Sequence, residues 1–306
     1  MAIQDVNFGL DILKTLQLDV GEASDGLTGD YATEFQGYIL RAYWEILKKE
    51  RWPWAMSDVP GTIVTAASVN ATANSISSAD PAVMTLSATH ATTLKGYKVY
   101  LDATQAIYRV ASHTAGTDSV TLDSEFVEDT TSGPVTFYKD EYAVASKDVM
   151  KIWDPLAIRG QWGGDVPLYS KTDFEDQYGR SWSPGPAPIE AATEIHWDFA
   201  SADGVRQLRF APWSEDKMVL EYDYTKFHTL DFSGAGAVDT PKIPRESRQV
   251  LVFLSSYYAF VLKDDTKADQ AFLNYTRFIG DMKDQYIPAG RPQFFVRSRY
   301  SLTLGL

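Results

Sequence analysis

The chain has 306 residues, of which 44% are hydrophobic and 13% aromatic, so it can bury a large core and disorder is excluded over most of its length. Its 28 basic and 41 acidic side chains give a net charge of −13, which disfavours tight binding to nucleic acid and to anionic membranes. Because cysteine is missing, disulfides, thiolate nucleophiles and thiolate-bound zinc are excluded.

The N-terminal part of the chain predicts two helices. A short helix is expected at residues 3–16. Over residues 30–51, apolar side chains recur at three- and four-residue spacing, which predicts one long amphipathic helix. Arg41 and Glu45 lie four residues apart on its predicted solvent-facing side. Pro53 ends this helix, because proline disfavours helical geometry in the residue before it.

A β-rich module follows Trp52. Serine, threonine and alanine dominate here, and no lysine or arginine occurs before Lys95. Short runs of strand-forming residues, bounded by turn formers such as Asp80-Pro81, predict a small barrel or sandwich. The predicted strands are residues 63–69, 83–87, 98–101, 107–112, 120–123 and 135–138.

The next region is expected to be ordered but poor in regular structure. Residues 153–188 contain three tryptophans and several glycines and prolines, which predicts irregular loops. A β-hairpin is then expected, with residues 207–210 leading through a turn at 212–216 and returning as 217–226. The return strand alternates apolar and polar residues, which predicts one buried face.

Two helices are predicted near the C-terminus, at residues 244–263 and 265–286. Their short connection predicts an antiparallel pair. The first is apolar on nearly all sides, so it should be covered by neighbours. Its apolar stretch is shorter than the roughly 18 residues of a membrane-spanning helix, and the N-terminus lacks a secretory signal. We therefore expect a soluble protein.

The segment beyond Pro288 is basic and aromatic and contains no acidic residue. Its apolar residues follow no helical period, and such a segment can add itself to the edge of a partner's sheet. The alternative is a frayed terminus. Because exposing large aromatic side chains is costly, we predict that this segment docks on a partner protein. The predicted partner-binding residues are Arg291, Phe294, Phe295, Val296, Arg297, Arg299, Tyr300, Leu302 and Leu304.

No motif predicts catalysis, a cofactor or a metal. The four histidines, His90, His113, His196 and His228, are scattered and match no metal-ligand spacing. Neither a nucleophile elbow nor a phosphate-binding loop occurs, and the glycine pair at 234 and 236 fits a linker. We predict that the protein is not an enzyme and has no catalytic, cofactor-binding or metal-binding residues.

One alternative site involves carboxylates beside aromatic rings. Asp173, Glu175 and Asp176 lie near Trp162, Tyr169 and Trp182 in the sequence. This combination could bind or cleave a sugar. Surface charges in an aromatic-packed loop are the commoner explanation.

The order of the segments carries a resemblance. A helix ends in Arg51-Trp52-Pro53-Trp54, and the β-module closes with Phe137-Tyr138-Lys139-Asp140-Glu141-Tyr142. Then come Leu208-Arg209-Phe210-Ala211-Pro212, Leu220-Glu221-Tyr222-Asp223-Tyr224 and the final helix pair. This layout resembles the head-to-tail adaptor (connector) proteins of tailed bacteriophages, with an extra β-domain inserted between the helical parts.

The fold expected from these patterns is α+β. It is an antiparallel helical bundle, made of the N-terminal helix and the C-terminal helix pair, with an inserted small β-barrel or sandwich and a β-hairpin region. The expected domains are a helical ring-forming domain at 1–59 and 240–288, an inserted β-domain at 60–145, a loop-rich and hairpin region at 146–239, and a C-terminal arm at 289–306.

The resemblance implies a structural virion protein in the phage neck or tail, assembled in the host cytoplasm. Copies would form a ring, a dodecamer in this family, that joins the portal to the tail and lines the DNA channel. The implied partners are other copies, the portal through the C-terminal arm, tail or nozzle proteins, and passing double-stranded DNA without sequence recognition, with no membrane. Two alternatives are a tail-tube or baseplate subunit and a carbohydrate-binding or glycan-cleaving virion protein.

Overall fold

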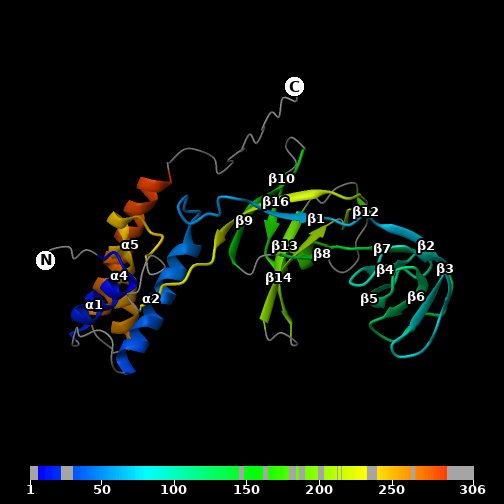
Figure 1. The fold of residues 1–306 in the computed structure, drawn as a ribbon, viewed down its shortest axis with the longest axis horizontal. Helices are drawn as coiled ribbons and strands as arrows, with labels where there is room; N and C mark the ends of the chain where they lie inside the picture. The colour runs from blue at the N-terminus through cyan, green and yellow to red at the C-terminus, as the bar shows by residue number, and fades with distance from the viewer. Residues whose placement is uncertain are drawn as a thin grey trace. The chain divides into compact units, whose positions relative to one another are not determined.

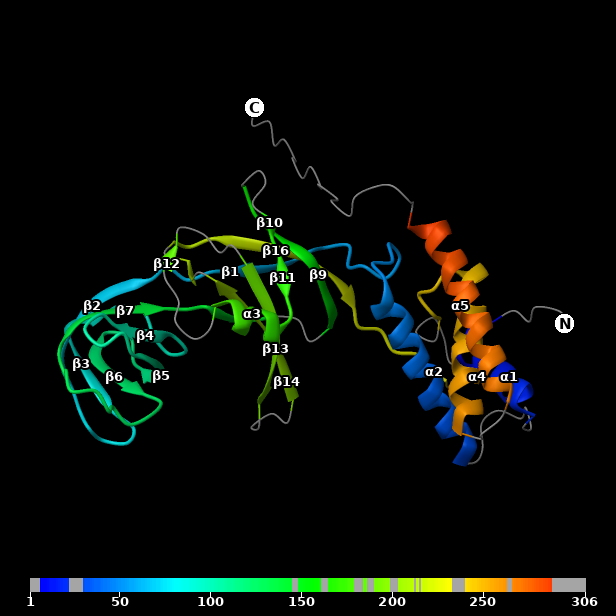
Figure 2. The ribbon, with the colours of Figure 1, turned by 180° about the vertical axis from the view of Figure 1, so that it is seen from behind.

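The computed structural model describes residues 6–21, 30–144, 148–160, 165–178, 184–185, 190–198, 203–211, 213–214, 216–232, 240–262 and 266–287. The chain divides into two compact units. Met1–Met56 and Thr225–Leu306 form one, here called the helical unit, and Ser57–Tyr224 form the other, here called the β unit. Figures 1 and 2 show their elements from opposite sides.

The described residues of the helical unit contain four α-helices. They are α1 (Gly9–Val20), α2 (Asp30–Lys49), α4 (Gln249–Leu262) and α5 (Lys267–Tyr286), and a 3-10 turn, η2 (Arg245–Ser247), precedes α4. Helix α4 contacts α1, α2 and α5 (Figure 1), and Val250, Leu251, Val252 and Leu254 on it are buried. The nearly continuous apolar sequence of α4 is thus explained by neighbours on several sides.

Two tryptophans fix the end of α2. The Trp52 side chain is fully buried, and its Nε1–H donates to the carbonyl oxygen of Ile46 over 2.7 Å. The Trp54 ring stacks on it with centroids 5.5 Å apart. The carbonyl groups in the last turn of a helix have no N–H donor from a following turn, and this hydrogen bond satisfies one of them.

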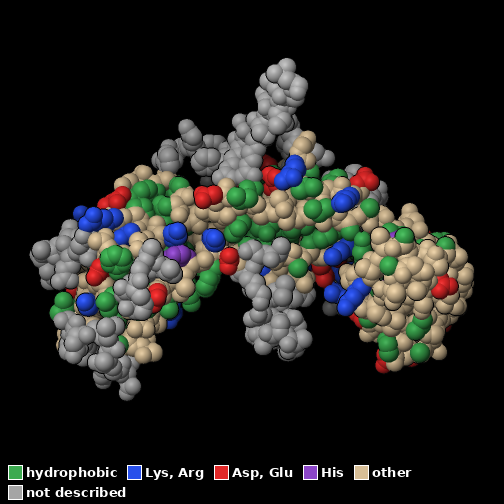
Figure 3. Space-filling model, viewed as in Figure 1, with side chains coloured by type: hydrophobic (Ala, Val, Ile, Leu, Met, Phe, Trp, Pro, Cys, Tyr) green, Lys and Arg blue, Asp and Glu red, His purple; other side chains and the backbone are tan. Residues whose placement is uncertain are grey.

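A closed six-stranded barrel forms one part of the β unit (Figure 1). Its order is β2-β3-β6-β5-β4-β7. The strands are β2 (Val69–Ile76), β3 (Val83–His90), β4 (Lys98–Leu101), β5 (Ile107–His113), β6 (Thr117–Leu122) and β7 (Gly133–Tyr138). Alternate residues fill the interior, among them Met84, Val99, Val120 and Phe137. Charged and hydrophobic side chains are sparse on the face of the barrel that Figure 3 shows, in agreement with the serine- and threonine-rich sequence of this part of the chain.

Two four-stranded sheets complete the β unit, with the orders β1-β16-β9-β10 and β11-β13-β14-β8. Their strands are β1 (Gly61–Val64), β8 (Glu141–Ala143), β9 (Val149–Ile158), β10 (Asp165–Val166), β11 (Leu168–Tyr169), β13 (Glu190–Asp198), β14 (Asp203–Ala211) and β16 (Val219–Lys226). Strands β12 (Pro184–Gly185) and β15 (Trp213–Ser214) form a separate short pair. Ile152, Leu156, Leu208, Phe210 and Leu220 share one core between the two sheets. Helix α3 (Lys171–Tyr178) contacts β13 (Figure 2).

The predicted fold class is wrong. The chain is a mixed α and β protein with a closed six-stranded barrel, and the described residues contain sixteen strands against five α-helices. It is therefore not an antiparallel helical bundle that carries an inserted barrel. The four helices of the helical unit were predicted because their apolar period is local. The short helix α3 was missed, and many of the strands are two to four residues long and pair with distant segments.

The predicted β-hairpin is also wrong in its pairing. Strand β14 pairs with β13 and β8, whereas β16 pairs with β1 and lies next to β9 in another sheet. The two strands are consecutive long strands in the sequence but do not pair with each other. The region 153–188, expected to be irregular, contains most of β9 together with β10, β11, α3 and β12.

Candidate functional site

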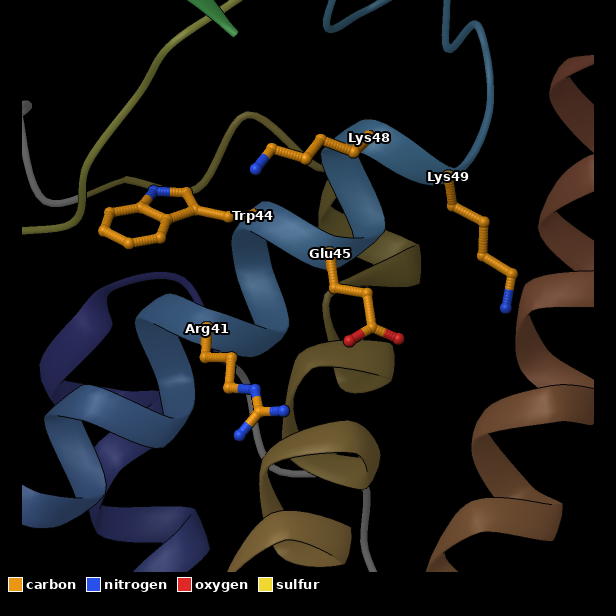
Figure 4. Close-up of a pocket in the computed structure, with 5 residues that line it drawn as sticks. All are labelled: Arg41, Trp44, Glu45, Lys48 and Lys49. Atoms are coloured by element: carbon orange, nitrogen blue, oxygen red, sulfur yellow. The ribbon is translucent and has the colours of Figure 1, made fainter. Parts of the chain in front are cut away.

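A shallow groove of ≈ 510 Å³ runs along α2 in the helical unit (Figure 4). Arg41, Trp44, Glu45, Lys48 and Lys49 line it, so it combines three cations, one carboxylate and one large aromatic ring. All come from the last three turns of one helix, and Arg41, Trp44 and Lys48 are spaced to share one side. Figure 4 shows Trp44 and Lys48 extending to the same side of α2. On the face of the helical unit that Figure 3 shows, lysine and arginine side chains occur together with acidic ones.

The segment after β16 borders Trp44. The indole Nε1–H donates to the carbonyl oxygen of His228 over 2.9 Å, and the ring lies 5.2 Å from the ring of Phe227. Phe227 remains 44% exposed. The two neighbouring rings therefore present apolar surface to solvent, with Trp44 held in place by its hydrogen bond.

Two lysines add positive charge beside His228. The His228 Nδ1 atom lies 2.9 Å from the hydroxyl of Tyr43, and this hydroxyl accepts the backbone N–H of Lys242 over 2.9 Å. The Tyr43 hydroxyl and Nδ1 are thus hydrogen-bond partners, and the tautomer of the imidazole sets which of them donates. Burial, followed by the charges of Lys242 and Lys226, lowers the pKa of His228.

Tyrosines of α4 and α5 hold the other side of the groove. The Arg41 guanidinium lies 4.5 Å from the centre of the Tyr258 ring, and the Tyr258 hydroxyl donates to the Glu45 carboxylate. Lys49 Nζ donates to the Tyr275 hydroxyl over 3.0 Å and lies 4.7 Å from the centre of its ring. Because three cations face one carboxylate, whose oxygen already accepts the Tyr258 hydroxyl, the lining is predominantly basic toward an incoming ligand.

The α4–α5 helical hairpin carries a second notable surface. Val261, Leu262, Phe272 and Leu273 are 51%, 66%, 45% and 62% exposed. Behind them, the ring of Tyr257 lies 5.0 Å from that of Phe272, and Phe272 lies 6.0 Å from Tyr275. Large apolar side chains gathered within one hairpin are typical of a surface that another protein covers.

The predicted partner-binding residues at 291–304 lie outside the described residues. The histidines have structural roles where they are described. The buried His113 accepts the backbone N–H of Leu94 over 3.1 Å, and His90 bonds the carbonyl of Thr92 over 2.9 Å. His196 belongs to β13, which lies in another sheet than the barrel strands that carry His90 and His113.

Asp173, one of the carboxylates of the alternative sugar site, takes part in capping a helix. Ser170 Oγ donates to Asp173 Oδ2 over 2.6 Å and accepts the backbone N–H of Asp173 over 3.2 Å, so these residues cap α3. Lys151 Nζ lies 3.8 Å from the centre of the Trp153 ring and covers it. Trp162 and Trp182 lie outside the described residues.

The groove was missed by the sequence reasoning, although a signal was present. Trp44 stands between charged residues on the predicted solvent-facing side of a helix, where a large aromatic ring is unusual. Within the described ranges, no group of three or more potential ligands could hold a metal ion. No helix in the same ranges is both long and apolar enough to span a membrane.

Comparisons with known proteins add little. No protein-family model matches this sequence, and no curated protein is significantly similar to it. One solved structure with some similarity is a chain of the TssK-TssF-TssG baseplate subcomplex of a type VI secretion system, determined by cryo-electron microscopy. The match has 9% sequence identity, covers 65% of each chain and has a TM-score of 0.18. At that score the similarity does not establish a common fold.

Proposed function

We propose that this chain is a non-enzymatic structural subunit of a tailed bacteriophage, a head-to-tail adaptor that assembles with copies of itself between portal and tail. The observation that carries the assembly role is the exposed apolar surface of the α4–α5 hairpin, formed by Val261, Leu262, Phe272 and Leu273. Surfaces of this kind mark protein interfaces. The class of assembly is taken from the order of sequence segments, which resembles that of the adaptors.

In this proposal the copies form a ring, a dodecamer as in the family that the sequence resembles. Double-stranded DNA passes through the ring without sequence recognition, since a net charge of −13 disfavours gripping of phosphates. The arm at 289–306 contacts the portal, and tail or nozzle proteins contact the ring on its other side. The protein is then part of the virion.

Imaging of the purified chain mixed with portal protein tests this function. Negative-stain micrographs should show rings seated on the base of the portal. Deletion of residues 290–306 should leave a folded protein that no longer attaches. Normal attachment of the deletion variant would remove the arm from the proposal, and failure of the full chain to attach would overturn the adaptor role.

A double substitution tests the assembly surface itself. Phe272→Ser combined with Leu273→Ser removes apolar surface that is 45% and 62% exposed, so it should reduce ring formation, at a moderate cost in stability from the lost contact between Phe272 and Tyr257. Thr276→Ser, an exposed polar position on the same helix, is the matched control and should assemble normally. Rings that form equally well from the double variant would overturn the assignment of this surface.

A tail-tube or baseplate subunit is the second candidate, and the β unit supplies the observation that favours it. Strand β1 lies at the edge of its sheet. Val64 at its end is 48% exposed, and Val59, two residues before the strand, is 70% exposed. An exposed edge strand can pair with a neighbouring chain. Tubes or baseplate-like assemblies without affinity for portal would favour this candidate.

A further inference from the structure

The α2 groove has the chemistry of a site for an acidic segment that also carries an apolar side chain. Arg41 and Lys48 are exposed on it, and Lys226 is exposed on the adjoining segment. Between them, Trp44 and the 44% exposed Phe227 supply an apolar surface. Cations around an aromatic centre favour a carboxylate-bearing ligand with an apolar side chain at its middle.

The chain itself contains a segment with the matching chemistry. Residues 123–129, between β6 and β7 of the barrel, read Asp-Ser-Glu-Phe-Val-Glu-Asp. Val127 is 75% exposed, the highest value among the large hydrophobic side chains of the described residues. Asp123, Glu125 and Asp129 around it are also exposed. This acidic loop therefore presents one apolar side chain surrounded by carboxylates.

The acidic loop is held in a defined conformation by its neighbours. Phe126 is 5% exposed, and its ring lies 5.4 Å from that of Tyr108 on β5. The backbone N–H of Val127 donates to the Tyr108 hydroxyl over 3.4 Å, and the backbone N–H of Arg109 donates to Asp123 over 3.3 Å. A loop fixed in this way loses little conformational entropy on binding.

We propose that the α2 groove of one copy binds the acidic loop of a second copy, with Val127 against Trp44 and Phe227. Charge complementarity supports this occupant, because nearly all of the chain's excess of acidic residues lies in the β unit, whereas the helical unit is close to neutral. Duplex DNA is the less suitable ligand, since the net charge of −13 repels it. The proposal rests on the self-assembly in the proposed function and adds a second contact between copies to that of the α4–α5 hairpin.

Charge reversal in the full chain tests this contact. Lys48→Glu and Glu125→Lys should each weaken self-association about tenfold, as followed by sedimentation velocity over a concentration series. Mixing the two variants, or combining both substitutions in one chain, should restore much of the affinity, because the opposite charges again face each other. Self-association of the unaltered chain should also weaken as salt rises, because the Debye length shortens.

The outcomes separate this proposal from the proposed function. Ring formation that neither reversal affects overturns the groove–loop contact and leaves the adaptor role standing. A chain that stays monomeric at every concentration, alone and with portal, overturns both. Duplex DNA binding that disappears in Lys48→Glu identifies nucleic acid as the occupant and overturns the proposal.

Cysteine cross-linking gives an independent measurement, since the natural chain contains no cysteine. Under oxidising conditions, Glu45→Cys chains mixed with Ser124→Cys chains should form a disulfide-linked dimer of the two. Ser87→Cys, an exposed position on β3, is the matched control and should not cross-link to Glu45→Cys. Equal cross-linking of both loop and control positions would contradict the proposed contact.

Discussion

The ammonium group of Lys98 lies 2.7 Å from the Asp140 carboxylate, whose side chain is only 1% exposed. Lys98 belongs to the barrel strand β4, and Asp140 precedes β8 of the second sheet. Lys98 also contacts Glu141 over 2.8 Å, and Arg109 bonds both oxygens of Glu141. Although burial raises the pKa of Glu141, the charges and hydrogen bonds of Lys98 and Arg109 lower it overall. This ionic cluster joins the barrel to the rest of the β unit.

Asp140→Ala should destabilise the β unit by about 3 kcal/mol, because it leaves the partly buried Lys98 without its closest carboxylate. Urea unfolding followed by tryptophan fluorescence measures the loss. The control is Glu221→Ala, which removes an ion pair with Arg159, a side chain that is 58% exposed. An exposed pair of this kind should contribute less than about 1 kcal/mol. Equal effects of the two substitutions would contradict a structural role of the buried cluster.

Gly61→Ala should destabilise the sheet that contains β1. Gly61 and Tyr222 are register partners, and a Cβ atom at Gly61 would lie 2.1 Å from Cζ of the Tyr222 ring. Because Tyr222 is 3% exposed, its ring has little room to move. We expect a loss of about 2 kcal/mol in denaturant unfolding.

The matched control for Gly61 is Gly280→Ala on α5. Apart from its chain neighbours and the backbone of its own helix, no atom lies within 4 Å of the place that a Cβ at Gly280 would take, and the position is inside a helix. Alanine should therefore stabilise the protein by about 0.5–1 kcal/mol through its higher helix propensity. If both substitutions stabilised the protein, the packing of the Tyr222 ring against residue 61 would not require glycine there.

The sequence predicts local elements better than the pairing between them. The helix expected at 30–51 and the strand expected at 98–101 correspond to α2 and β4, and both predictions are confirmed. The spacing of apolar side chains that identifies each element lies within that element's own residues. Strand β8 shows the limit, because it has three residues and is fixed only by pairing with β14, more than sixty positions later in the chain.

The candidate groove could be predicted only in part. Spacing alone places Arg41 and Glu45 on one side of α2, but the sequence does not show that Tyr258 of α4 would stack on one and bond the other. The contact between Trp44 and His228 joins positions 184 residues apart. Such tertiary neighbours decide which polar residues of a helix remain available for a partner.

The stability of the helical unit should fall as the pH is lowered from 7 toward 5.5. His228 has a lowered pKa in the folded protein, so the unfolded chain binds a proton first and folding becomes less favourable as the pH falls through this range. Thermal melts at several pH values measure the slope. His228→Asn cannot titrate, so its slope over the same range should be flatter. An unchanged slope would assign the effect to other groups.

Phe126→Ala and Val127→Ala should separate folding from association at two adjacent positions. Phe126 is 5% exposed and packs on Tyr108, so its truncation should cost about 3–5 kcal/mol of stability and release the acidic loop. Val127 is 75% exposed, so its truncation should change stability by less than about 0.5 kcal/mol while weakening self-association severalfold. Denaturant unfolding and sedimentation velocity on the same samples measure the two effects. Of these two side chains, Val127 is the one proposed to contact another copy. A Val127→Ala protein that associates like the unaltered chain would therefore exclude this side chain from the interface.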